Sequence, residues 1–166
     1  MTPILAHIQT LLIRDLGGMK KEIEAFPNDQ QIWEVLPGVV NPAGTLAIHL
    51  CGNLKHYVGF VMGGIPYTRD RENEFANRSL SKAEISREIE STIEVLKRAF
   101  SSIDSTLLGT IYPERVGGFE LNTQQFLLHL CSHFALHLGQ AGYLRRILSG
   151  SVQSTGPASL AEVALG

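Results

Sequence analysis

The chain has 166 residues, of which 44% are apolar and 18% are charged, and its formal net charge is −2. This length and composition fit a single soluble domain with one core. Lysines and arginines form no block of the kind that nucleic-acid binding needs, and no stretch is long and apolar enough to cross a membrane. Its two cysteines form no Cys-x-x-Cys motif and its start does not resemble a signal peptide, so we expect a reducing, cytoplasmic setting.

The first helix is predicted from about Pro3 to Glu24, because apolar residues recur there at steps of three and four. A stretch with Pro and Asn follows, and its tryptophan, Trp33, is expected to close one end of the core. The second helix is predicted to run from Asn41, as its N-cap with Pro42 in the first helical position, to about residue 61.

The charged segment 67–80 is interpreted as a connection that crosses the bundle, with Arg69-Asp70-Arg71 expected to be solvated surface. The third helix should begin at Ser81, because Ser81-Lys82-Ala83-Glu84 matches a capping box, and an apolar stripe continues it to about Ile103.

The fourth helix is predicted to begin at Asn122, with Gln125 three residues later, and to continue to about Leu148. From Gly150 the chain is rich in Ser and Gly, which predicts a loosely held tail over 150–166 with a short turn at Ser159–Ala164. Four helices and no strand pattern indicate an all-α fold, a four-helix bundle formed by residues 1–149.

Three of the six histidines lie on the fourth predicted helix at steps of four: His129, His133 and His137. Residues four apart lie on one helix face, one turn apart, so two such imidazoles can bind one ion. The alternative is that they are ordinary core histidines. Burying several imidazoles together is unfavourable unless their ring nitrogens find partners, and a divalent metal ion is a good partner.

A third candidate ligand, His49, lies in an apolar run of the second predicted helix. His56 has nearly the same angular position but lies about 10 Å further along the axis, so the two cannot both bind one ion from this helix alone. His49 is favoured for its apolar surroundings, and His56 is interpreted as a partly solvated histidine. Cys51 and Cys131 are each two residues from a histidine, a rotation of about 200°, so both thiols should point away as small apolar residues.

These residues resemble a known family. The segment from His133 to Gln140 resembles the fourth-helix motif of the DinB/YfiT-like superfamily, in which two histidines four apart are followed by Gly-Gln after one intervening residue. The segment from His49 to Leu54 resembles the second-helix histidine of that superfamily, and Arg69–Phe75 resembles the crossover of one branch. The resemblance covers about residues 3–148.

The resemblance implies a four-helix bundle in up-down-down-up order, with a long crossover between its second and third helices. It also implies a metal site at His49, His133 and His137. Superfamily members include S-transferases that use bacillithiol or mycothiol and a mycothiol-dependent isomerase, and dimers are common. We therefore expect a homodimeric, metal-dependent enzyme that transfers a low-molecular-weight thiol to an electrophilic small molecule, or hydrolyses a small molecule.

Two other interpretations stay open. One is a non-enzymatic, dimeric stress-response or interaction protein with a vestigial or empty metal site, and the other is a metal-sensing or storage module. Three histidine ligands leave positions open on a divalent ion, as in catalytic rather than structural sites, and such an ion lowers the pKa of a bound water or thiol. The ligands suit zinc, nickel, iron or manganese, and the usual affinity order favours zinc or nickel over manganese.

A protease with a His-Glu-x-x-His motif is disfavoured, because Phe134 stands where that motif has its glutamate. The polar side chains expected near the ion are few, which suits Lewis-acid chemistry better than elaborate acid–base catalysis. They are Asn53, His56, His129 and Gln140. Gln140 has an alternative role as a cap of a backbone group or a residue of a helix contact.

Overall fold

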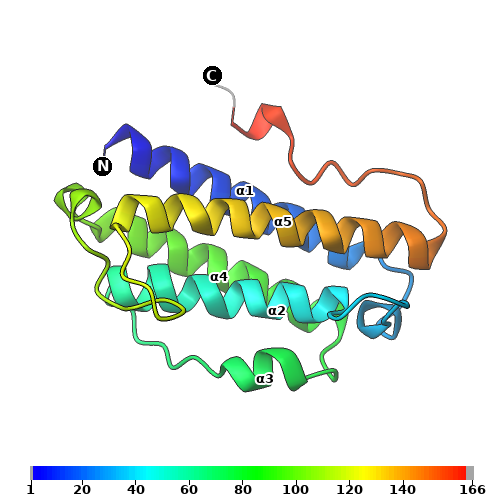
Figure 1. Ribbon diagram of the computed structural model, residues 1–166. Coiled ribbons are helices and arrows are strands. Elements are labelled where there is room, and N and C mark those ends of the chain that lie inside the picture. The colour runs from blue at the N-terminus through cyan, green and yellow to red at the C-terminus, as the bar shows by residue number, and fades with distance from the viewer. Residues whose placement is uncertain (1, 164–166) are drawn as a thin grey trace.

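The computed structural model describes residues 2–163, and within this part of the chain it contains five α-helices and no β-strand. Four long helical segments lie side by side (Figure 1). They are α1 (Pro3–Glu24), α2 (Ala43–Leu54) with its π-helical continuation η2 (Lys55–Met62), α4 (Lys82–Ser102) and α5 (Thr123–Ser149). Both α1 and α2 pack against α4 and α5. The prediction of an all-α fold is confirmed.

The core lies between these helices because each carries an apolar stripe. Side chains of α1 that recur at three- and four-residue steps are completely or almost completely buried, and α4 contributes a similar stripe. Burial of one such side chain stabilises the fold by about 1.5–3 kcal/mol. The stripe residues are Leu5, Ile8, Leu12, Leu16, Met19 and Ile23 of α1, and Ile85, Ile89, Leu96 and Phe100 of α4.

The helix starts follow local capping chemistry, with one correction. Ser81 and Glu84 form the predicted capping box of α4, and the Asn122 side chain accepts a hydrogen bond from the backbone N–H of Gln125 at the start of α5. The predicted start of α2 is wrong by one residue. Pro42 has an extended ψ of 163° and is itself the N-cap, so Asn41 lies outside the helix.

The second helix does not stay α-helical to residue 61, because residues 55–62 form the π-helix η2. This end of the helix lies very close to α4. A Cβ added at Gly59 would be 2.5 Å from the Val95 side chain, and one added at Gly63 would be 2.5 Å from that of Ala99. Glycine at these two positions therefore permits the close approach of η2 and α4.

The crossover from η2 to α4 contains a short helix that the sequence did not predict, α3 (Arg71–Ala76). The Asp70 side chain caps it by accepting from the backbone N–H of Asn73. The expectation that Arg69 is solvated surface is wrong, because its side chain is only 10% exposed. Three 3-10 turns complete the described chain: η1 (Gln31–Trp33), η3 (Ser105–Gly109) and η4 (Leu160–Glu162).

Trp33 packs at one end of α2, where its indole N–H donates to the Leu80 carbonyl and its ring leaves no room for a side chain at Gly44. The tail after α5 returns over α1. The buried pair of Glu22 and Arg145 anchors it, since Arg145 donates to the carbonyl of Gln153. The predicted loose order of this tail stays a prediction, and residues 164–166 of it, with the end of the predicted turn, lie outside the described residues.

Candidate metal centre

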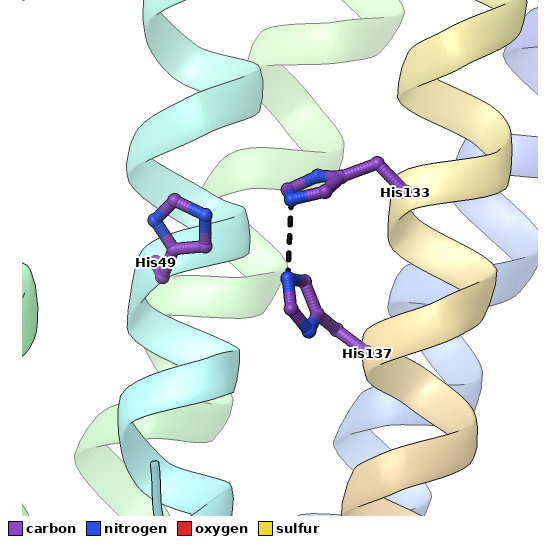
Figure 2. A group of neighbouring side chains, drawn as sticks. All are labelled: His49, His133 and His137. Atoms are coloured by element: carbon purple, nitrogen blue, oxygen red, sulfur yellow. Dashed lines mark hydrogen bonds between the residues drawn. The ribbon is translucent and has the colours of Figure 1, made fainter. Parts of the chain in front are cut away.

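The structure brings the three predicted ligands together from two helices. His49 lies on α2, and His133 and His137 lie on α5. One candidate ligand atom from each of the three residues lies within 4.8 Å of the other two. The Nε2 atoms of His133 and His137 are 3.1 Å apart, and Figure 2 shows a ring nitrogen of His49 facing these two rings.

Packing of neighbouring apolar residues fixes this arrangement. Leu46 and Leu50 of α2 are buried on either side of His49, and Phe134 and Leu138 of α5 are buried next to the other two histidines. The histidine face of α5 is therefore held toward α2 by the same contacts that form the core. The four-residue spacing on α5 supplies two of the three rings, and the packing of α2 on α5 supplies the third.

Two of the rings are oriented by acceptors at their outer nitrogens. His49 Nδ1 lies 2.9 Å from Glu74 Oε2, and His137 Nδ1 lies 2.7 Å from Gln140 Oε1. Carboxylate and amide oxygens accept hydrogen bonds, so both Nδ1 atoms carry the proton and both Nε2 atoms keep a free lone pair. Neutral imidazoles with oriented second nitrogens are the donor set that zinc and related ions use, so these residues fit a divalent ion.

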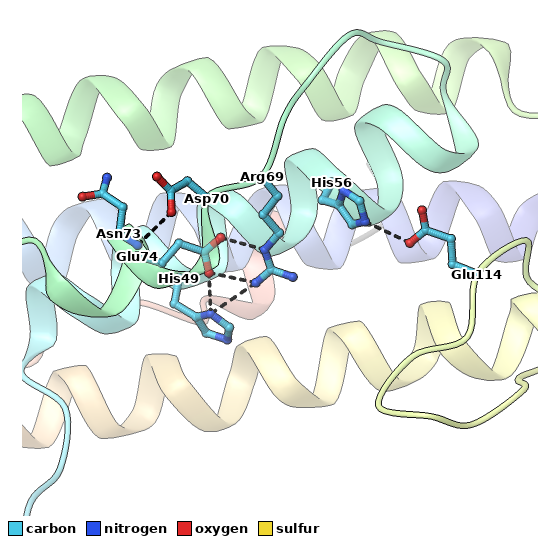
Figure 3. Close-up of polar contacts among 7 residues, drawn as sticks. All are labelled: His49, His56, Arg69, Asp70, Asn73, Glu74 and Glu114. Atoms are coloured by element: carbon cyan, nitrogen blue, oxygen red, sulfur yellow. Dashed lines mark hydrogen bonds and ion pairs between the residues drawn. The ribbon is translucent and has the colours of Figure 1, made fainter.

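Glu74, which lies on α3, was not predicted as part of this site. Its side chain is 4% exposed, and Arg69 binds it with two hydrogen bonds, from Nε to Oε1 at 2.7 Å and from Nη2 to Oε2 at 2.8 Å (Figure 3). Burial raises the pKa of Glu74, but hydrogen bonds and charges from Arg69 and His49 outweigh burial and hold that pKa below its usual range. Glu74 is thus an ionised acceptor for His49.

Glu74 fits against α2 because residue 52 has no side chain. A Cβ at Gly52 would overlap the Glu74 carboxylate. The only signal in the sequence for this contact was the resemblance of the segment 69–75 to a family crossover, and that resemblance assigned no role to the glutamate.

The surroundings of His133 keep its ring neutral. Burial, followed by the charges that His137 and His49 would carry, lowers the pKa of His133 from 6.5 to about 4. At neutral pH the ring is unprotonated and can donate a lone pair. Nearby positive charge from Arg69 acts in the same direction.

Of the other polar residues named from the sequence, His129 and Asn53 lie beside the cluster and His56 does not. His129 is exposed, and its ring stacks on that of His133 with 5.9 Å between centroids. Asn53 is 8% exposed and forms no hydrogen bond through its side chain with the residues that the structure describes. His56 stands apart from the cluster and pairs with Glu114 at 2.9 Å.

Neither cysteine belongs to the cluster. Cys51 is buried and Cys131 half-buried. Burial raises the pKa of Cys51 to about 12 and that of Cys131 to about 11, so both remain protonated thiols at neutral pH.

Two cavities touch the histidines. We call the first the arginine-lined cavity; it has a volume of about 430 Å³ and reaches His49 and His133. We call the second the apolar cavity; it has a volume of about 490 Å³ and reaches His137. Residues lining the arginine-lined cavity include Asn53, Tyr57, Arg69, Arg71 and His129. Those lining the apolar cavity include Leu36, Val39, Leu144 and Ile147.

Fold and site together define an all-helical protein with a three-histidine cluster that could hold a metal ion. A family model described as "Protein of unknown function (DUF1572)" matches residues 6–155, which is most of the chain, so the chain belongs to that family. No curated protein matches it. Among the described residues, no helix combines the length and the apolar character needed to cross a bilayer.

Proposed function

We propose that this protein binds one divalent metal ion through His49, His133 and His137 and acts as an enzyme on a small molecule. The reaction is transfer of a low-molecular-weight thiol to an electrophilic substrate, or hydrolysis. The observation that carries the proposal is the convergence of three imidazoles within 4.8 Å. Zinc or nickel is the favoured ion, with iron and manganese as the other candidates.

When bound, the ion would supply Lewis-acid chemistry, because three neutral ligands leave its charge undiminished and positions open for a thiol or water. The chain's own residues prepare the ligands. Glu74 holds the proton of His49 on Nδ1, and Arg69 keeps Glu74 ionised. Gln140 orients His137 in the same way. The arginine-lined and apolar cavities give small molecules access to both sides of the cluster.

We also propose that the chain is a member of the DinB/YfiT-like superfamily, with its up-down-down-up bundle order and a cytoplasmic location. The colour order of the four long helices and the long crossover before α4 support this order (Figure 1). A homodimer is part of the proposal. Exposed apolar residues on α5 support it: Leu136, Tyr143 and Ile147 are 59%, 68% and 62% exposed.

The same exposed residues favour a second candidate function, a non-enzymatic dimeric interaction protein whose metal site is vestigial. Exposed apolar residues that recur along one helix are typical of protein–protein contacts. The two candidates differ in whether metal and thiol turnover belong to the protein, and one set of measurements separates them.

The test measures metal content and thermal stability of protein purified without a histidine tag, beside His49→Ala, His133→Ala and His137→Ala. His7→Ala is the matched control, because His7 is an exposed histidine of α1 and belongs neither to the cluster nor to the lining of the two cavities. We expect one equivalent of metal in the wild type and the control, and none in the three ligand variants. Consumption of thiols with an aryl halide then tests transfer. No metal after reconstitution with zinc, nickel, iron and manganese salts would refute the enzyme proposal in favour of the interaction protein.

A further inference from the structure

Resting on the proposed function, and deepening it, we infer that the arginine-lined cavity binds the carboxylate group of the substrate or thiol. Three features of the cavity lead to this class of ligand: its charge, an amide that has no partner in the protein, and an arginine with unused donors. The cavity also contains His49 and His133, so a ligand anchored in it lies beside the cluster.

The charge of the lining favours an anion. Among the described residues that line this cavity are Arg69 and Arg71, and none is an aspartate or glutamate. Another cavity, between α2, the crossover and α4, has a lining of the opposite charge, since Asp70, Glu84 and Glu88 are among its residues. Because the charge of Arg69 is balanced by Glu74, Arg71 supplies the uncompensated positive charge.

Asn53 supplies the second feature. It lies one turn after His49 on α2, only 8% of the residue is exposed, and it lines the cavity. No residue that the structure describes forms a hydrogen bond with its amide. The amide atoms still reach solvent through the cavity, so this N–H group is free to donate to an acceptor that enters the cavity.

Arg69 supplies the third feature. Its Nε and Nη2 atoms are used by Glu74, while Nη1 has no hydrogen bond with any described residue, and Figure 3 shows this nitrogen pointing away from the carboxylate. Arg71 is exposed, with its guanidinium 5.1 Å from the Phe75 ring centre. An arginine fork matches a carboxylate in both charge and geometry.

A ligand held by these donors would present its remaining atoms to the histidines. Its carboxylate would accept hydrogen bonds from Asn53 and the two arginines, and its reactive group would lie toward His49 and His133. The apolar cavity on the His137 side is then free for the uncharged electrophile. The two cavities thus differ in the chemistry that they accept.

The test compares 3-mercaptopropionate with its uncharged methyl ester. Cobalt(II) is loaded into the wild type, Asn53→Ala, Arg71→Gln and the control Arg87→Gln, an exposed arginine of α4. The visible spectrum of cobalt reports thiol binding. We expect the acid to bind the wild type and the control about tenfold more tightly than the ester, as hydrogen bonds to a charged group allow. This preference should fall several-fold in the other two variants and weaken with salt.

Equal affinity for acid and ester, or a preference that survives both substitutions, would overturn the inference while leaving the metal proposal intact. If neither the wild type nor any variant binds cobalt, the metal proposal fails, but the inference about the cavity can still be tested in metal-free protein. There, 3-mercaptopropionate should shift the side-chain amide signals of Asn53 in ¹⁵N NMR spectra and the ester should not. Absence of any such shift would overturn the inference in that case as well.

Discussion

Replacing Glu74 by glutamine should weaken metal binding although Glu74 is expected to touch no metal. The change keeps the size of the side chain but removes the negative charge of Glu74, whose Oε2 atom lies 2.9 Å from His49 Nδ1 and holds the proton on that nitrogen. Loss of such an outer partner of a metal-ligating histidine typically costs 10- to 100-fold in affinity, or about 1.4–2.7 kcal/mol. We expect the lower end, about tenfold, because the amide oxygen can still accept the hydrogen bond.

The same substitution should destabilise the metal-free protein for a separate reason. Arg69 is 10% exposed at its side chain and pairs only with Glu74 among the described acidic residues. Removing one member of a buried ion pair typically costs about 3–5 kcal/mol, because the other charge stays buried without compensation. Since Arg69 reaches the edge of a cavity and the amide retains some hydrogen bonding, we expect about 2 kcal/mol.

Two assays separate these effects. Competition with a chromophoric chelator measures zinc affinity in folded protein, and urea denaturation in EDTA measures the stability of metal-free protein. Glu72→Gln is the control, because Glu72 lies on the same short helix and is exposed. If Glu74→Gln binds zinc as tightly as the control does, the carboxylate does not orient His49, and the reasoning is refuted.

Two further predictions concern the same cluster. Gly52→Ala should weaken zinc binding and destabilise the fold, because the added methyl group overlaps the Glu74 carboxylate. The control Gly139→Ala, whose methyl group meets no atom within 4 Å, should stabilise α5 by about 0.5–1 kcal/mol. Chelator competition and urea denaturation measure both variants, and equal effects of the two substitutions would contradict the packing argument. In EDTA, stability should fall as the pH drops from 6.5 toward 4, because unfolded chains protonate His133 near its ordinary pKa of 6.5 and the folded protein only near 4. The loss is at most about 3 kcal/mol, and denaturation of His133→Gln across this range should show a correspondingly smaller loss.

Much of the fold was readable because its signals are local. The 3.6-residue periodicity and the caps Ser81 and Asn122 placed α4 and α5 correctly. The π-helix η2 was not readable, because no pattern along the chain marks where the hydrogen bonding of the second helix changes or how closely glycines 59 and 63 approach α4. The cap of α2 was misplaced because proline fixes only φ, and the extended ψ of 163° that keeps Pro42 outside the helix is not specified by its ring.

The residues of the candidate site also differ in whether local patterns along the chain were sufficient to predict them. His133 and His137 are neighbours by helix geometry alone, so their spacing was sufficient to predict that they face one another. His49 required the packing of α2 on α5, which its apolar environment and the family resemblance of residues 49–54 indicated only indirectly. Glu74 required more, since its burial depends on Gly52 of α2 and on Arg69 of its own segment. A charged crossover has the same composition whether it is solvated or folded over a site.

The different ways in which the three histidines are held determine how changes in the crossover should act on the cluster. The two α5 rings are held by the helix and by the core, so α3 influences the proposed metal site through His49, which contacts both Glu74 and the Phe75 ring of α3. His49 is then the adjustable ligand, and the charge and packing of the crossover adjust it. A connection that looks like solvated surface in the sequence therefore belongs to the candidate metal centre, and comparisons within the family should follow the residues at positions 52, 69 and 74 together with the histidines.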